Sequence, residues 1–211
     1  MQYAESQSIA KPGVSRPGSG LLVREVLAPG AFVIAILVTN YAMTGLPNVK
    51  LFDLLVLVAG YSLGLRRGAL VAVAAWMVYG SFNPFGYAQP QLLATLMASE
   101  VGYAAAGALI RRVMAPSAVR RRPSLLSAGL LAAAVVATGA YDLVTNAYTG
   151  YFWATIAGSS DYGRWIPLAM FHSGALFFMA VHVGSNAMLF PVFGPLLMQG
   201  VERGKHALGW R

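Results

Sequence analysis

The chain of 211 residues contains no cysteine and few charged residues. Without cysteine it has no disulfide, no thiolate metal site and no thiol nucleophile. Charged residues make up only 10% of the sequence, whereas a soluble domain carries about 25%. Hydrophobic residues make up 57%. The chain lacks the polar surface of a protein that stays in water, so the sequence predicts a membrane protein.

Apolar stretches separated by short polar segments fill most of the chain. A helix that spans a membrane needs about 20 apolar residues, and six such helices with short loops use nearly the whole length. We therefore predict an all-α membrane protein, a bundle of six transmembrane helices within residues 24–200. The second and third stretches are short: the second contains two glycines, and a glycine flanks the third at each end. The six stretches are 27–43, 51–65, 69–79, 92–110, 125–147 and 166–199.

The sixth stretch is longer than one span requires. Pro191 and Pro195 lie near its end, and proline interrupts helical hydrogen bonding. We therefore expect a kink or a break into two helices near these prolines. The segment Arg66-Arg67-Gly68 is expected to form a tight turn between the second and third stretches.

The distribution of basic residues predicts the orientation. Only Lys50 and Arg164 among the 15 Lys and Arg residues lie in segments that a six-span topology places outside. Short basic loops are retained in the cytoplasm, so both termini should be cytoplasmic. Residues 1–23 should form a flexible cytoplasmic tail, and residues 201–211 a basic one. The other thirteen are Lys11, Arg16, Arg24, Arg66, Arg67, Arg111, Arg112, Arg120, Arg121, Arg122, Arg203, Lys205 and Arg211.

The net charge of +8 does not indicate a nucleic-acid partner. Topology and anionic membrane lipid account for basic residues at helix ends. The sequence also lacks the alternation of aromatic and basic residues that stacks bases. The expected localisation is the prokaryotic cytoplasmic membrane, as a multi-pass protein in contact with lipid.

Six of the polar residues within the apolar stretches lie in the fourth, fifth and sixth stretches, where such residues are costly and usually face the bundle interior. They either form hydrogen bonds between helices or mark a functional site, and the sequence leaves this open for Glu100, His182 and Asn186. For Asp142 and Asn146 a site near the outer surface is favoured. His172 and His182 are ten residues apart, about 80° around a helix, and no HxxxH or HExxH pair exists, so no metal site and no cofactor are predicted. The six are Glu100, Asp142, Asn146, His172, His182 and Asn186.

The longest outer segment, about 148–165, is rich in aromatic residues, including Trp153 and Trp165. Tyr and Trp concentrate at the membrane–water interface, so these rings form either an aromatic belt or a lid over an outward-facing pocket. The segment 83–86, Asn-Pro-Phe-Gly, has the composition of a turn.

Several of these segments together resemble a known family, the substrate-binding S-components of energy-coupling factor (ECF) vitamin transporters. The resemblance covers about residues 25–200. In the first half it lies in residues 48–60, 63–71 and 83–86. In the second half it lies in residues 141–146 and 171–173, and in residues 185–187, Pro191 and 194–195.

The resemblance implies a six-helix protein, not an enzyme, that captures a vitamin or related micronutrient in an outward-facing pocket. Its partners would be a transmembrane T-component and two cytoplasmic ATPases, and the chain itself has no phosphate-binding loop. Ala31 and Ala35 match the small-residue pattern through which the first helix contacts the T-component. The nickel and cobalt branch carries a histidine at its mature N-terminus, where this chain has Gln2.

We expect the substrate between the outer ends of the helices, where aromatic rings would stack a planar ligand. Thiamin-like, flavin-like, corrinoid and deazapurine ligands remain open. The alternatives are a structural or assembly subunit of another membrane complex, and an intramembrane metal-dependent enzyme that uses Glu100, Asp142 and the histidines. The predicted substrate-binding residues are Asn48, Asp53, Asn83, Asp142, Asn146, Trp153, Trp165 and His172.

Overall fold

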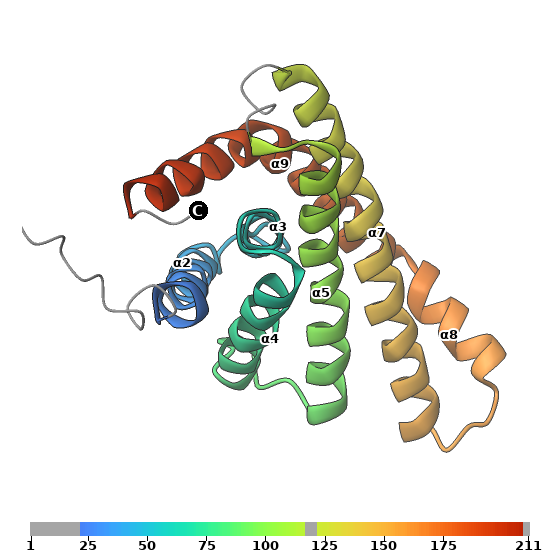
Figure 1. The fold of residues 1–211 in the computed structure, drawn as a ribbon. Coiled ribbons are helices and arrows are strands. Elements are labelled where there is room, and N and C mark those ends of the chain that lie inside the picture. Colours follow the sequence, from blue (N-terminus) through green and yellow to red (C-terminus); the bar gives the residue numbers. More distant parts are fainter. Residues whose placement is uncertain (1–21, 117–121, 209–211) are drawn as a thin grey trace, which may run out of the picture.

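The computed structural model describes residues 22–116 and 122–208, which contain helices and no strand. The prediction of an all-α protein is confirmed for these residues. Of the basic residues on which the orientation rests, Lys11, Arg16, Arg120, Arg121 and Arg211 lie outside the described part, as does most of the predicted tail 1–23. The elements in order are η1 (Val23–Leu27), α2 (Ala28–Ala42), α3 (Phe52–Leu63), α4 (Leu65–Ser81), α5 (Pro90–Val113), α7 (Pro123–Ile156), α8 (Tyr162–Phe171) and α9 (Ser173–Ala207) (Figure 1).

Within the described residues, four helical segments are long and apolar enough to cross a membrane, as in a multi-pass membrane protein. They are Val23–Ala42, α5, α7 and α9. The helices from the second and third stretches are shorter, with 12 residues in α3 and 17 in α4. At 1.5 Å per residue, α3 is about 18 Å long and α4 about 26 Å. α3 is therefore too short to cross the apolar layer of about 30 Å on its own.

α3 is the central helix of the bundle. Every residue from Phe52 to Leu63 is buried, and α2, α4, α5 and α9 all contact it (Figure 1). Two glycines bring α3 and α5 into backbone contact. A Cβ atom on Gly60 would lie 2.1 Å from the carbonyl oxygen of Ala104, and one on Gly107 would lie 2.0 Å from that of Leu57. Small residues allow such close approach between helices in lipid.

α3 ends in a turn at Gly64, whose φ of +89° lies in the region that favours glycine. The expected turn at 66–68 is thus wrong by a few residues, because Arg66 and Arg67 already belong to the first turn of α4. The last carbonyls of α3 accept hydrogen bonds from three basic side chains. These are Arg111 to Tyr61 at 3.1 Å, Lys205 to Ser62 at 2.9 Å and Arg67 to Leu63 at 3.2 Å. Cations there complement the negative end of the helix dipole.

The sixth apolar stretch is broken into two helices, which is one of the two expected outcomes. The break does not lie at the prolines, however. α8 ends at Phe171 and α9 begins at Ser173, while Pro191 and Pro195 lie inside α9. The break falls at His172, which has extended backbone dihedrals and caps α9 with its side chain. Neighbouring helices allow proline within membrane helices. Through Ala207, α9 also includes most of the segment predicted as a C-terminal tail.

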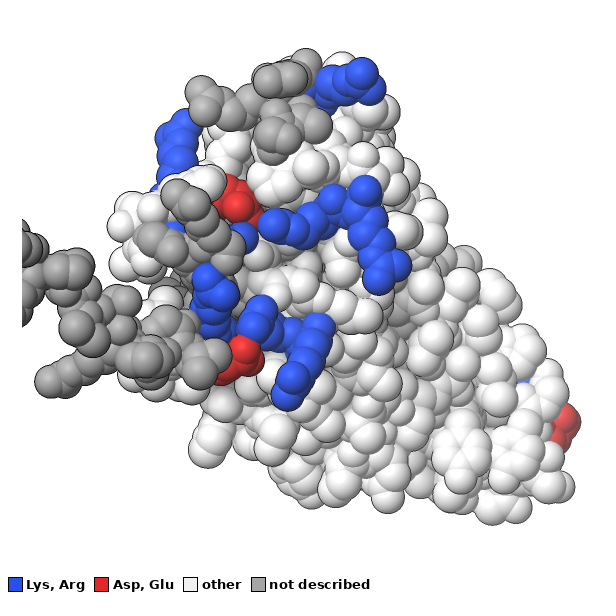
Figure 2. All heavy atoms as spheres, viewed as in Figure 1, with Lys and Arg blue, Asp and Glu red and all other residues white. Residues whose placement is uncertain are grey.

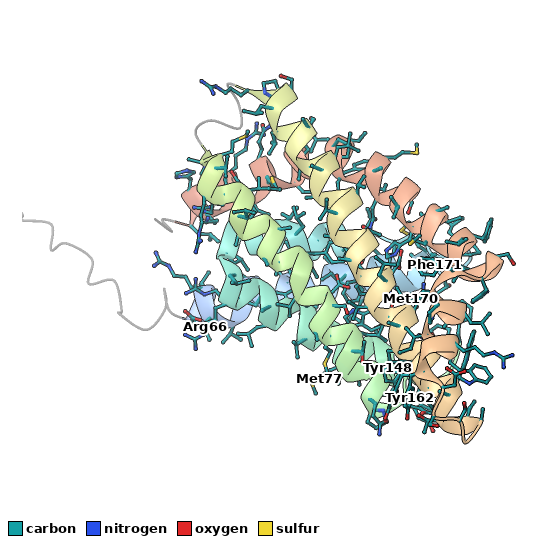
Figure 3. All side chains as sticks on the ribbon, turned by 90° about the vertical axis from the view of Figure 1, so that its right-hand side faces the viewer. Arg66, Met77, Tyr148, Tyr162, Met170 and Phe171 are labelled. Atoms are coloured by element: carbon teal, nitrogen blue, oxygen red, sulfur yellow. The ribbon has the colours of Figure 1, made fainter. Side chains whose placement is uncertain are left out.

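The outer segment predicted as a loop over 148–165 is mostly helical. α7 continues to Ile156 and α8 starts at Tyr162, so only 157–161 connect them. Figure 3 shows Tyr148, Tyr162, Met170 and Phe171 at one end of the bundle and Arg66 at the other. The described Lys and Arg side chains other than Lys50 and Arg164 belong to helix ends near Arg66, and Figure 2 shows basic side chains gathered there. The two ends therefore differ in charge.

Candidate ligand cavity and buried charge network

A cavity of about 700 Å³ opens at the end of the bundle that is poor in basic residues. This volume is within the range of small-molecule sites, about 300–1,000 Å³. The ends of α2, α4 and α7, the start of α9 and the segment before α3 form its wall. Its aromatic lining is Trp76, Tyr79, Phe85 and Phe178, and its polar lining is Asn40, Thr44, Asn48, Lys50, Asn146, Thr149 and His172.

The segment between α2 and α3 is fixed to α9 by Asn48. Its side-chain amide donates to the carbonyl oxygen of Phe178 at 2.8 Å, and its own φ is +55°. Asparagine is among the few residues that adopt this conformation readily. This anchor places Lys50, two residues later, in the cavity wall.

Lys50 links the cavity to the bundle interior. Its side chain is 14% exposed, and its Nζ lies 3.2 Å from Oδ1 of Asp53. The ammonium also lies over the rings of Tyr141, Trp76 and Phe52, at 5.0, 5.5 and 5.7 Å from their centroids. Burial lowers the pKa of Lys50, but the nearby carboxylates of Asp53 and Glu100 outweigh it, so the pKa is raised. Lys50 is therefore a charged donor in the wall.

Behind Lys50, His182 connects two carboxylates. Its Nε2 lies 2.6 Å from Oδ2 of Asp53 and its Nδ1 lies 2.9 Å from Oδ1 of Asp142. When both carboxylates are ionised, only a doubly protonated ring donates at both nitrogens. Asn186 donates to the same Asp53 oxygen at 2.7 Å. His182 and Asn186, four residues apart on one face of α9, thus both form hydrogen bonds with the neighbouring helix α3.

The network reaches α5 and α4 through further buried groups. Asn186 and Tyr103 both donate to the hydroxyl of Thr138, at 2.9 and 3.1 Å. On the α4 side, the indole of Trp76 donates to Oε2 of Glu100 at 3.0 Å. Oε1 of Glu100 and Oδ2 of Asp142 are buried and have no hydrogen-bond partner among the residues that the structure describes. The polar core thus ties together five helices, α3, α4, α5, α7 and α9.

Three of the eight predicted substrate-binding residues line the cavity: Asn48, Asn146 and His172. Asp53 and Asp142 lie behind the wall, in contact with His182. Their role in substrate binding stays a prediction.

The other three residues do not line the cavity. Asn83 accepts a hydrogen bond from the backbone N–H of Phe85 in its own turn. The ring of Trp153 lies 5.7 Å from that of His172. Trp165 passes close to α7, because a Cβ on Gly150 would lie 2.6 Å from its carbonyl oxygen.

The two residues predicted to contact a T-component, Ala31 and Ala35, lie in different environments. Ala31 is exposed, whereas Ala35 is half-buried and packs against the hydrophobic core. Only Ala31 therefore has its side chain fully available to another protein or to lipid.

Sequence reasoning missed Lys50, Trp76 and Tyr79 as cavity residues. Two signals were present for Lys50. It is one of two basic residues on the side otherwise poor in charge, and it precedes the buried Asp53 by three positions, the spacing of a side-chain pair. The two aromatic residues lie in the third apolar stretch, where their positions resemble those of ordinary core residues.

Within residues 22–116 and 122–208, no three His, Asp or Glu side chains are grouped to hold a metal ion. Compared with known proteins, the chain matches no family model, no curated protein and no solved structure. The resemblance to S-components therefore stays a prediction that rests on the sequence motifs.

Proposed function

We propose that this protein is a membrane-embedded binding subunit that captures a small, vitamin-like molecule from outside the cell for an ECF-type importer. The observation that carries the proposal is the cavity of about 700 Å³ at one end of the bundle, lined by aromatic and amide side chains. Such a mixture of apolar surface and a few polar groups is typical of small-molecule sites.

The charge distribution supports an outward-facing cavity. Basic side chains gather at the opposite end of the bundle, and short basic segments are retained in the cytoplasm. In this arrangement all six stretches cross the membrane and both termini are cytoplasmic. α3 is shielded from lipid by four other helices, so its short length is compatible with a central position.

Energy for uptake would come from partners. In the proposed complex, a T-component contacts the α2 face that carries the exposed Ala31, and two cytoplasmic ATPases hydrolyse ATP. The protein would act in the cytoplasmic membrane of a prokaryote. The sequence motifs of the S-component family are the support for these partners.

Mass spectrometry of the protein purified in mild detergent tests the proposal, because a bound vitamin-like molecule should co-purify. Ala175→Trp should remove that molecule, since Ala175 lines the cavity, whereas Ala180→Trp, on the exposed face of the same helix, should retain it. Ligand-free preparations, with no thermal shift across a vitamin panel, would favour a structural or assembly subunit instead.

A further inference from the structure

We infer that the ligand of this cavity presents a hydrogen-bond acceptor, a carboxylate or a conjugated carbonyl oxygen, to Lys50, and that it is not an organic cation. The inference rests on the proposed binding function and specifies the class of molecule that the cavity takes. The basis of the inference is that Lys50 belongs to the cavity lining, whereas the carboxylates of Asp53 and Asp142 lie behind that lining, bonded to His182.

Among the residues that the structure describes, those lining the cavity include one basic residue, Lys50, and no Asp or Glu. Asp53 and Asp142 face inward and bond His182, and Glu100 bonds Trp76. A cationic ligand would therefore meet the like charge of Lys50 first and would find no exposed counter-charge. Like charges at contact are unfavourable, especially where water is excluded. This disfavours a thiamin-like cation among the ligands that the sequence left open.

Lys50 has donor capacity left for a ligand. An ammonium carries three N–H donors and no acceptor, and Asp53 is the polar partner that the structure gives it. Because Oδ2 of Asp53 already binds His182 and Asn186, Oδ1 is available to hold Lys50. The rings around the ammonium restrict its position further. Lys50 is thus positioned before any ligand arrives.

A second donor lies on the start of α9. The Nδ1 of His172 accepts hydrogen bonds from the backbone N–H groups of Gly174 and Ala175, at 3.1 and 3.3 Å. A neutral ring with an acceptor at Nδ1 carries its proton on Nε2, which is then a donor. The ring contacts Trp153. Lys50 and His172 therefore favour a ligand with acceptor atoms at two places on its edge.

Three probes with a common indole ring test this inference in the full-length protein after removal of any co-purified molecule. Indole-3-acetate carries a carboxylate, indole-3-acetamide a neutral carbonyl and tryptamine an ammonium. By calorimetry, the first two should bind at least tenfold more tightly than tryptamine. Lys50→Met should abolish this preference and Lys50→Arg should keep it. Arg164→Met, which removes an exposed charge outside the cavity, should have no effect.

Tighter binding of tryptamine, or a preference that survives in Lys50→Met, overturns the inference. A co-purified ligand with an ammonium group and no carbonyl or carboxylate also overturns it, yet leaves the proposed binding function intact. A folded protein that yields no co-purified molecule, shows no thermal shift across the vitamin panel and binds none of the probes contradicts both proposals.

Discussion

Replacement of Gly107 by alanine tests whether the backbones of α3 and α5 must touch. Gly107 lies on α5 and faces the fully buried α3. A Cβ atom there would lie 2.0 Å from the carbonyl oxygen of Leu57 and 2.8 Å from the backbone nitrogen of Tyr61. Both neighbours are main-chain atoms of a helix, so no side-chain rotation can relieve the overlap.

The expected cost follows from this geometry. Real Cβ atoms essentially never approach within 3.0 Å of another atom, so the two helices must separate locally by about 1 Å. Overpacking of a well-packed core costs about 1–3 kcal/mol, occasionally more. Because α3 is enclosed by four helices, the shift disturbs several interfaces, and we expect a loss near the upper value, about 3 kcal/mol.

Gly102 provides the matched control on the same helix. A Cβ atom at Gly102 has no neighbour within 4 Å, and alanine is favoured over glycine within a helix by about 1 kcal/mol. Gly102→Ala should therefore be neutral or slightly stabilising. The assay is equilibrium unfolding in mixed detergent micelles, followed by circular dichroism.

Gly60→Ala should behave like Gly107→Ala, since its Cβ would lie 2.1 Å from the carbonyl oxygen of Ala104. Equal free energies of unfolding for the Gly107 and Gly102 variants would refute the proposed backbone contact between α3 and α5.

Three further substitutions probe other parts of the molecule. His182→Ala leaves two buried carboxylates without their shared partner, so the free energy of unfolding should fall by about 3–5 kcal/mol; a loss below 1 kcal/mol would contradict the network. Lys205→Met leaves the carbonyl of Ser62 without its donor and should lower the free energy of unfolding by about 1–3 kcal/mol, whereas Arg203→Met, at an exposed position, should leave it unchanged. Ala31→Trp should abolish association with a T-component in pull-down experiments. It should preserve ligand binding, because Ala31 is exposed. Ala35→Trp should abolish the same association and, in addition, lower the free energy of unfolding, because Ala35 packs against the core. Normal association of Ala31→Trp would place the coupling contact elsewhere.

The helical class was predictable because hydropathy depends on composition over long windows. The stretches at 92–110 and 125–147 correspond to α5 and α7. Both helices extend beyond the limits of the predicted stretches. Hydropathy does not show how far a helix continues once it has left the apolar layer. The last turns of α7 are rich in aromatic residues, and the sequence therefore predicts an outer loop there. Their backbone is helical.

The polar core was only partly predictable. Spacing along one helix shows that His182 and Asn186 share a face, but it does not show which neighbouring helix that face meets. Their partner, Asp53, lies 129 positions before His182 and belongs to a short helix buried on all sides. That long-range pairing depends on the packing order of the helices, which no local pattern in the sequence specifies.

The burial of α3 has a consequence for the order in which the protein enters the membrane. A helix of 12 residues with an aspartate in its first turn is a poor independent substrate for insertion. It is too short to cross the apolar layer, and a charged side chain within the membrane is costly. Lys50, three residues from Asp53, is synthesised with it and neutralises its charge long before His182 exists. α3 should therefore enter together with α4 as one hairpin around Gly64, and should become stably packed only after α9 has been synthesised. Glycosylation mapping of chains truncated before α9 should find this hairpin less completely inserted in Lys50→Met than with Lys50 present. The full-length Lys50→Met protein should still insert, because His182 and Asn186 of α9 bond Asp53 there.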